Sequence, residues 1–214
     1  MVQVLRNVLG AWKTTRIRHC GLLAVDVASS GQWDSEQFVR ARATLFESLR
    51  TAFEDSGVPW RACRTSDRGD GMVVVVPQRF PVHRLAYPLL DRLSAQLRHH
   101  NRYARSPLRV RVALHAGTVH IDRYGATGYA KVLLARLLES PPVRGALADA
   151  PESCPVAAIV SNTFYDDVVR NGYPGIELER YVPVDVHVKE SSVRGWVHVP
   201  GYVSSDAERR LRSV

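Results

Sequence analysis

The sequence lacks the features of a membrane or secreted protein. Its longest uncharged apolar run, residues 72–78, is far short of the roughly 20 residues that a membrane-spanning helix needs. No long apolar block follows the basic residues near its start, so we predict no secretory signal. Its three cysteines are widely spaced and form no C-x-x-C pair. This scarcity argues against a zinc site and favours reduced thiols in a cytoplasmic protein.

The chain also lacks the composition of a disordered or fibrous protein. Of its 214 residues, 45% are hydrophobic and 23% are charged, which are globular proportions. A net charge of +8 favours a polyanionic partner such as nucleic acid, an anionic membrane surface or nucleotide phosphates, although a solvated arginine-rich surface explains it equally well. We predict a basic N-terminal arm or short helix over residues 1–19, one domain over residues 20–202 and a flexible tail over residues 203–214.

The hydrophobic pattern alternates between strand and helix signals. The apolar run over residues 21–27 predicts a buried strand, and strand-like runs at 60–65 and 72–77 predict a β-hairpin. Alternation over residues 108–116 predicts a half-buried strand with Arg109 and Arg111 on its polar side. Further helices are expected at about 34–57, 85–105, 133–139 and 161–170, and further strands at 156–160, 181–188 and 195–199. The order β-α-β-β-α-β, then α-β-α-β-β, indicates an α+β fold with a ferredoxin-like core and helices on one face.

Two aspartates carry the strongest chemical signal. Asp26 ends an apolar strand, and Asp70 lies at the tip of the predicted hairpin. Because the first strand of a ferredoxin-like sheet lies beside the hairpin, we expect the two carboxylates to converge and to favour a divalent cation. A pair of such ions can activate an attacking oxygen and stabilise a leaving one. Asp70 is also an ordinary turn residue, whereas an acid that ends a buried strand needs a partner.

Four segments together resemble the successive signatures of class III nucleotide cyclase domains. They are GLLAVDVASS (21–30), SDRGDGMVVVV (66–76), RVALHAGTVHIDRYGATGYAKVLLARLLE (111–139) and VPVDVHVKE (182–190). The similarity covers about residues 20–200 and is strongest to stand-alone domains of actinobacterial type. It extends more distantly to the pyrimidine cyclases of bacterial antiphage signalling (Pycsar-type). The resemblance implies a palm-like α+β domain that converts a nucleoside triphosphate into a 3′,5′-cyclic nucleotide and pyrophosphate.

The resemblance also implies roles for individual residues. Asp26 and Asp70 match the aspartates that bind two Mg²⁺ or Mn²⁺ ions, and Val27 matches the position that lends a backbone carbonyl to the metal. Arg136 matches the arginine that stabilises charge on the phosphates as they break, and Lys189 matches the lysine that holds the terminal phosphates. Sites in this family form between two chains, so a head-to-tail homodimer is implied.

Other positions bear on the nucleobase and on catalysis. Ser66 and Gly125 stand where purine cyclases usually carry a selective pair, which makes a pyrimidine triphosphate, UTP or CTP, the expected substrate. Gly128 matches a family glycine in a loop that is either close to the base or a plain connector. Arg68 could reach a base or a phosphate, or could be an exposed turn residue. Val132 replaces the usual asparagine, so one hydrogen bond that orients the ribose is missing.

Two other functions fit the same residues. A catalytically degenerate module could bind nucleotide, or merely dimerise, and regulate a partner; Val132 favours this hypothesis, whereas the retained Asp26, Asp70, Arg136 and Lys189 disfavour it. A nucleic-acid-binding domain is compatible with the basic charge. It is disfavoured because the predicted strands show no exposed aromatic pair of the kind that stacks RNA bases.

Overall fold

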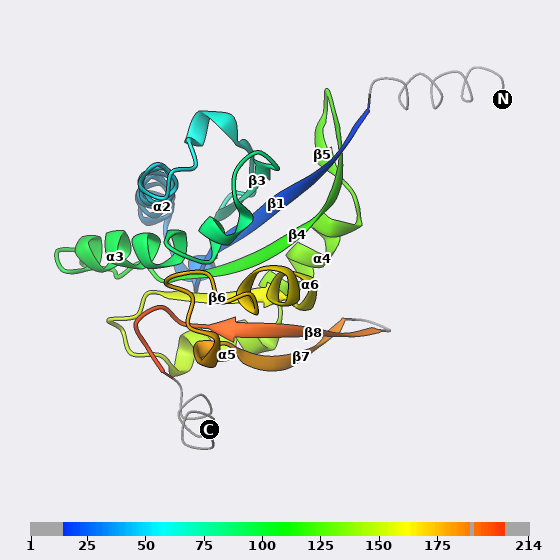
Figure 1. The fold of residues 1–214 in the computed structure, drawn as a ribbon. Coiled ribbons are helices and arrows are strands. Elements are labelled where there is room, and N and C mark those ends of the chain that lie inside the picture. Colours follow the sequence, from blue (N-terminus) through cyan, green and yellow to red (C-terminus); the bar gives the residue numbers. More distant parts are fainter. Residues whose placement is uncertain (1–14, 189–190, 204–214) are drawn as a thin grey trace.

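A single mixed sheet organises the protein, as the computed structural model shows for residues 15–188 and 191–203 (Figure 1). The strands are β1 (Arg16–Val27), β2 (Arg64–Asp67), β3 (Gly71–Pro77), β4 (Val110–Asp122), β5 (Gly125–Thr127), β6 (Val156–Ser161), β7 (Val182–Val188) and β8 (Ser191–His198). Their order is β2-β3-β1-β4-β6-β8-β7, with β5 paired to β4. Only β4 and β6, among the described strands, pair in parallel. The predicted α+β class is confirmed.

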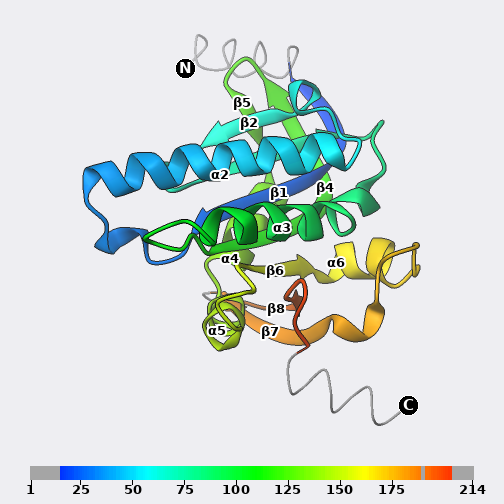
Figure 2. The same cartoon turned by 90° about the vertical axis from the view of Figure 1, so that its left-hand side faces the viewer.

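Helices cover both faces of this sheet. They are α2 (Ser35–Asp55), α3 (Leu89–Asn101), α4 (Tyr129–Leu138), α5 (Pro141–Asp149) and the short α6 (Asn162–Phe164). Figure 2 shows α2 and α3 side by side across one face, and their apolar residues form one core with that face. A second core joins α4 and α5 to the opposite face. The expectation of helices on one face therefore holds for the first six elements, whereas the C-terminal extension covers the other side.

Strand alternation decides which residues face α4 and α5. In β1, Leu23 and Val25 point into the core beneath α2 and α3, whereas Leu22 and Ala24 point into the core beneath α4 and α5. Because successive side chains of a strand point to opposite faces, Asp26 lies on the α4 and α5 face. The same rule, applied along β4, places Arg111 on that face as well.

The β1–β4 pair is longer than the sequence predicts. β1 begins at Arg16 rather than near residue 21, and its first half continues the antiparallel register from Cys20 opposite Gly117 to Arg16 opposite Ile121. Residues 16–19, expected to be part of an arm, thus belong to a strand extension in which β4 pairs with β1 on one side and, at its end, with β5 on the other (Figure 1). Residues 1–14 of the arm expected over 1–19, and residues 204–214 of the tail expected over 203–214, lie outside the described residues.

Several predicted boundaries also shift. The first half of the expected strand at 60–65 is a 3₁₀ turn, Trp60–Ala62, and β2 follows it. The expected helix at 161–170 begins as α6, capped by the Ser161 side chain, and continues as a wider π-helical turn. α5 was not expected at all. The described residues contain no helix that is both long and apolar enough to cross a bilayer, and all three cysteines are unpaired.

Candidate functional site

The ends of β1 and β3 bring Asp26 and Asp70 together. Asp26 lies opposite Gly71 in the antiparallel register, and the Val27 amide donates a hydrogen bond of 3.0 Å to the Asp70 carbonyl oxygen. Gly71 permits this approach, because a Cβ atom there would lie 2.1 Å from the Val25 carbonyl oxygen. The structure therefore places Asp26, Val27 and Asp70 at one rim of the sheet, as the sequence-based argument expects.

Arg111 on β4 forms a bidentate salt bridge with the Asp26 carboxylate. Its Nε and Nη2 atoms donate to the two carboxylate oxygens, each at 2.8 Å, and both side chains are only about 15% exposed. Burial raises the pKa of Asp26, and the neighbouring Asp70 charge acts in the same direction, while Arg111 opposes both. Asp26 is thus a largely buried carboxylate whose pKa stays above its usual value, because burial outweighs the opposing effect of the arginines.

Arg111 was not among the predicted site residues. Alternation placed it correctly on the face opposite Val110 and Val112, but that face is packed beneath α4 and α5 rather than exposed, so the expected half-buried strand is buried on both faces. The contact of Arg111 with Asp26 depends on the β1–β4 register, in which the two residues are direct cross-strand partners. A sequence signal was available, because an arginine beside a strand-ending acid on a neighbouring strand is a common way to neutralise that acid.

Asp70 is positioned by its own hairpin and by the loop after β1. The Ser30 hydroxyl donates to Asp70 Oδ2 at 2.7 Å. In the hairpin tip, the Gly69 amide donates to Asp67 Oδ1 at 2.9 Å, and the Arg68 amide donates to the Gly71 carbonyl at 2.9 Å. The tip is therefore a hydrogen-bonded turn that fixes where the Asp70 carboxylate lies.

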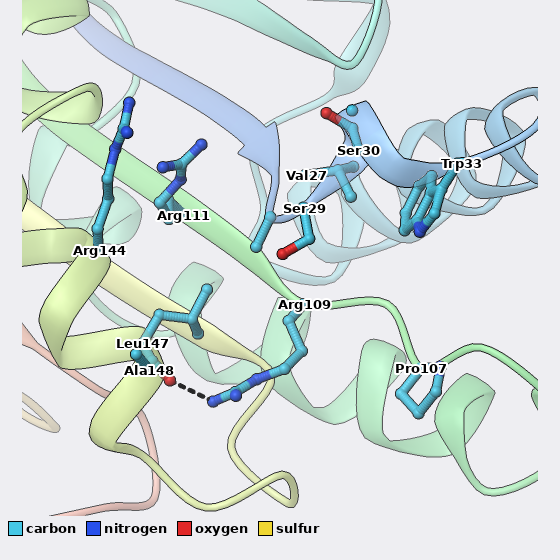
Figure 3. A pocket seen from close by; sticks show the side chains of 12 residues that line it. Val27, Ser29, Ser30, Trp33, Pro107, Arg109, Arg111, Arg144, Leu147 and Ala148 are labelled. Carbon is cyan, nitrogen blue, oxygen red and sulfur yellow. Dashed lines mark hydrogen bonds between the residues drawn. The ribbon is translucent and has the colours of Figure 1, made fainter.

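A cavity of about 640 Å³ opens next to this rim of the sheet (Figure 3). Val27, Ser30 and Arg111 line it and adjoin the two aspartates, whereas Asp26 and Asp70 are not themselves among its lining residues. The loop after β1 forms one side and α5 forms the other, and Arg111, which binds Asp26, lies between them. Its volume falls within the roughly 300–1,000 Å³ of small-molecule sites. Its cationic lining residues are Arg109, Arg111 and Arg144. A cavity with three guanidinium groups beside two carboxylates suits a ligand that carries both metal and phosphate.

The remaining predicted site residues lie elsewhere on the same chain. Ser66 is on β2 and Arg68 in the exposed hairpin tip, whereas Gly125 is on β5 and Gly128 precedes α4 with a φ of 134°. Arg136 is a half-buried residue of α4. None of these five residues lines the cavity beside Asp26. Lys189 lies outside the described residues.

The hairpin tip and α4 are nevertheless close to each other. Burial, together with the charge of Arg68, lowers the pKa of Lys131 on α4. The Lys131 ammonium donates to the Ala126 carbonyl at 2.8 Å and so ties α4 to the end of β5. Arg68, Gly125 and Gly128 therefore lie close to α4 or to the short strand before it, and none of them lines the cavity next to Asp26.

The donor set at Asp26 and Asp70 fits a divalent cation that also binds substrate. Within residues 15–188 and 191–203 there is no cluster of three or more histidine, cysteine or acidic side chains that could hold a metal alone. Two adjacent carboxylates are incomplete as a protein-only site. They suit Mg²⁺ or Mn²⁺, however, because Mg²⁺ is usually bound by one or two carboxylates plus substrate phosphates.

No family model and no curated protein matches this sequence. The structure does resemble solved cyclase domains. The guanylyl cyclase Cya2 matches with 16% identity and a TM-score of 0.63, over 90% of this chain and 96% of that one. An adenylate/guanylate cyclase/hydrolase from Silicibacter pomeroyi matches with 18% identity and a TM-score of 0.62, over 87% and 99%. The adenylyl cyclase CyaB from P. aeruginosa matches with 13% identity and a TM-score of 0.56, over 90% and 98%. These likenesses establish the fold.

Proposed function

Starting from a fold shared with class III adenylate and guanylate cyclase catalytic domains, we propose that this chain is a nucleotide cyclase. The substrate is a nucleoside triphosphate, and the products are a 3′,5′-cyclic nucleotide and pyrophosphate. The observation that carries the proposal is the convergence of Asp26 and Asp70 beside an arginine-lined cavity. A fold alone would not carry it, since one fold hosts many functions.

The residues suit an in-line displacement at the α-phosphate. The ribose 3′-oxygen bonds to the α-phosphorus, the bond from that phosphorus to the bridging oxygen of the β-phosphate breaks, and the 3′-hydroxyl proton passes to solvent. Asp26, Asp70 and the Val27 carbonyl would hold Mg²⁺ or Mn²⁺, which supplies positive charge at the reacting oxygens when bound. Arg111 neutralises Asp26 before substrate arrives and offers the same two donors to a phosphate afterwards.

We also propose that two copies assemble head to tail. The resemblance implies that a second copy supplies Arg136. On its own chain Arg136, like Ser66, Arg68, Gly125 and Gly128, does not line the cavity next to Asp26, which is compatible with that arrangement. Lys189 would belong to the same partner-supplied group. In that arrangement Arg136 stabilises charge on the breaking phosphates, and each dimer holds two equivalent sites.

The proposed substrate is a pyrimidine triphosphate, UTP or CTP. Ser66 and Gly125 offer neither the ammonium nor the carboxylate that would pair with a purine. The Ser66 hydroxyl can both donate and accept a hydrogen bond, which suits the polar edge of a pyrimidine. A role in bacterial signalling or antiphage defence would follow from a cyclic pyrimidine product.

The test is to incubate the purified protein with each ribonucleoside triphosphate and Mn²⁺ and to detect cyclic product by mass spectrometry. We expect one pyrimidine triphosphate to be cyclised, and Asp70→Asn to abolish the product. The exposed Asp55→Asn is the matched control, with the same change in charge at the end of α2. Product formation that survives Asp70→Asn, or no product from any triphosphate, would refute the proposal.

A second experiment tests the shared site. Asp70→Asn and Arg136→Ala are each expected to be inactive, but their mixture should regain about a quarter of wild-type activity, because half of the dimers are mixed and each mixed dimer keeps one intact site. No recovery on mixing would contradict the head-to-tail arrangement.

A catalytically degenerate module remains the second candidate, and one observation favours it. Val132 is a 46% exposed apolar residue at the position where the resemblance implies an asparagine. A missing donor of this kind can cost about a hundredfold or more in rate. Binding of triphosphate by wild-type protein with no turnover would identify this function instead.

A further inference from the structure

Arg144 is a cation of the cavity that the chemistry proposed above leaves unused. It lies on α5, the helix that forms one side of the cavity, and Figure 3 shows its side chain extending in the same direction as that of Arg111. The Asp26 carboxylate interacts electrostatically with both arginines. Arg144 therefore belongs, by position, to the same charged site, although it comes from a different part of the chain.

Arg109 holds α5 in this place. Its Nη2 atom donates to the carbonyl oxygens of Leu147 and Ala150 at the C-terminal end of α5, the latter at 2.9 Å. Figure 3 shows this side chain directed at the helix rather than into the open space. Carbonyls at a helix C-terminus carry partial negative charge, so they are suitable acceptors for Nη2, whereas the Arg109 Nε atom is buried without a hydrogen-bond partner among the described residues. Arg109 thus serves to hold α5 against the sheet, and Arg111 and Arg144 remain as the cations that can bind a ligand.

The charge of Arg144 has no close counter-ion. Among the described residues, no carboxylate lies within salt-bridge distance of it. The single acid of α5, Asp149, lines a different groove against β7 and β8. Asp26, the carboxylate that interacts with Arg144, is already bonded through both oxygens to Arg111. The cavity therefore presents a surplus guanidinium to any anion that enters it.

We propose that Arg144 binds the terminal phosphates of the nucleoside triphosphate in the same chain that supplies Asp26. The identification of the ligand as a triphosphate rests on the proposed function. Two guanidinium groups in one cavity, Arg111 on β4 and Arg144 on α5, can engage several phosphate oxygens at once. The contribution of Arg144 should therefore grow with the number of phosphates on the ligand.

The experiment uses inorganic tripolyphosphate and inorganic phosphate as probes, with binding measured by calorimetry in the absence of metal. Arg144→Gln should weaken tripolyphosphate binding about tenfold or more, and should change phosphate binding much less. Arg144→Lys should restore part of the loss, because it restores charge without the planar fork. Arg92→Gln, an exposed arginine on α3, is the matched control and should bind both probes like wild type.

Three outcomes would overturn the inference: no tripolyphosphate binding by wild type, an unchanged affinity in Arg144→Gln, or an equal loss in Arg92→Gln. Loss of binding in Arg144→Gln alone supports it, whether or not wild type forms cyclic product. Cyclic product from wild type with no effect of Arg144→Gln on tripolyphosphate would overturn this inference and leave the proposed function standing. The role of Arg144 and the proposed cyclase activity can therefore be refuted independently of each other.

Discussion

Replacement of Arg111 by glutamine is expected to make the aspartate pair a better metal site. Arg111 occupies both oxygens of Asp26 with hydrogen bonds of 2.8 Å, and the pair is largely buried. A cation that binds Asp26 must therefore compete with the guanidinium for the same carboxylate. The variant removes the competitor and its charge, while the glutamine amide can still donate one hydrogen bond to Asp26.

The size of the effect follows from those two bonds. Hydrogen bonds to charged groups contribute about 1.5–3 kcal/mol each, and metal binding gives up only part of that. We therefore expect Mn²⁺ to bind Arg111→Gln roughly ten- to a hundredfold more tightly than wild type, or about 1.4–2.8 kcal/mol. Binding of a triphosphate should change in the opposite direction, because the phosphates lose a bidentate donor.

The assay is the titration of free Mn²⁺ by electron paramagnetic resonance at pH 8, without nucleotide. The double variant Asp26→Asn/Arg111→Gln should lose the gain, which would locate the ion at Asp26. Thermal melts show whether each variant is folded. An affinity for Mn²⁺ that is equal to or lower than that of wild type in folded Arg111→Gln would refute the idea that arginine and metal share one carboxylate.

Three further predictions test other parts of the account. Val132→Asn, at an exposed site, should raise the rate of cyclisation roughly tenfold or more with little change in Tm; an unchanged rate would show that the missing amide is not limiting. Gly71→Ala should destabilise the protein by about 1–3 kcal/mol in urea unfolding, because its Cβ would collide with the Val25 carbonyl, and unchanged stability would contradict that geometry. Burial lowers the pKa of His115 and of His198 to about 4, so the folded state keeps both neutral. Stability should therefore fall as the pH falls below about 6.5, by about 2 kcal/mol per histidine at pH 5, and a His198→Phe variant that loses as much as wild type between pH 7 and pH 5 would disprove this.

Much of the sheet was predictable because its central strands are buried on both faces. The apolar runs at 21–27, 72–77 and 156–160 each lie within an observed strand or match it to within a residue. The first part of β1 was not predictable in this way. Arg16, Ile17 and Arg18 are exposed and show no burial pattern, and they are strand residues because β4 pairs with them. Pairing with a distant segment leaves little local signal.

The candidate site, like the sheet, could be predicted from the sequence only in part. The convergence of Asp26 and Asp70 could be predicted, because a strand-ending acid and a hairpin tip are local features that the expected topology brings together. The roles of Arg111 and Arg144 could not. The first depends on a register across 85 residues of chain, and the second depends on how α5 packs over the sheet. Two prolines at the start of α5 resemble a break in the chain, although they occupy the first turn, where a helix tolerates proline.

The most direct test of the central claim is to locate Mn²⁺ in crystals grown with a non-cyclisable triphosphate analogue, using its anomalous scattering. We expect peaks in contact with the carboxylates of Asp26 and Asp70 and with the analogue's phosphates, and we expect Arg111 to move from Asp26 to a phosphate oxygen. Mn²⁺ bound elsewhere, with Asp26 still paired to Arg111 through both oxygens, would contradict it.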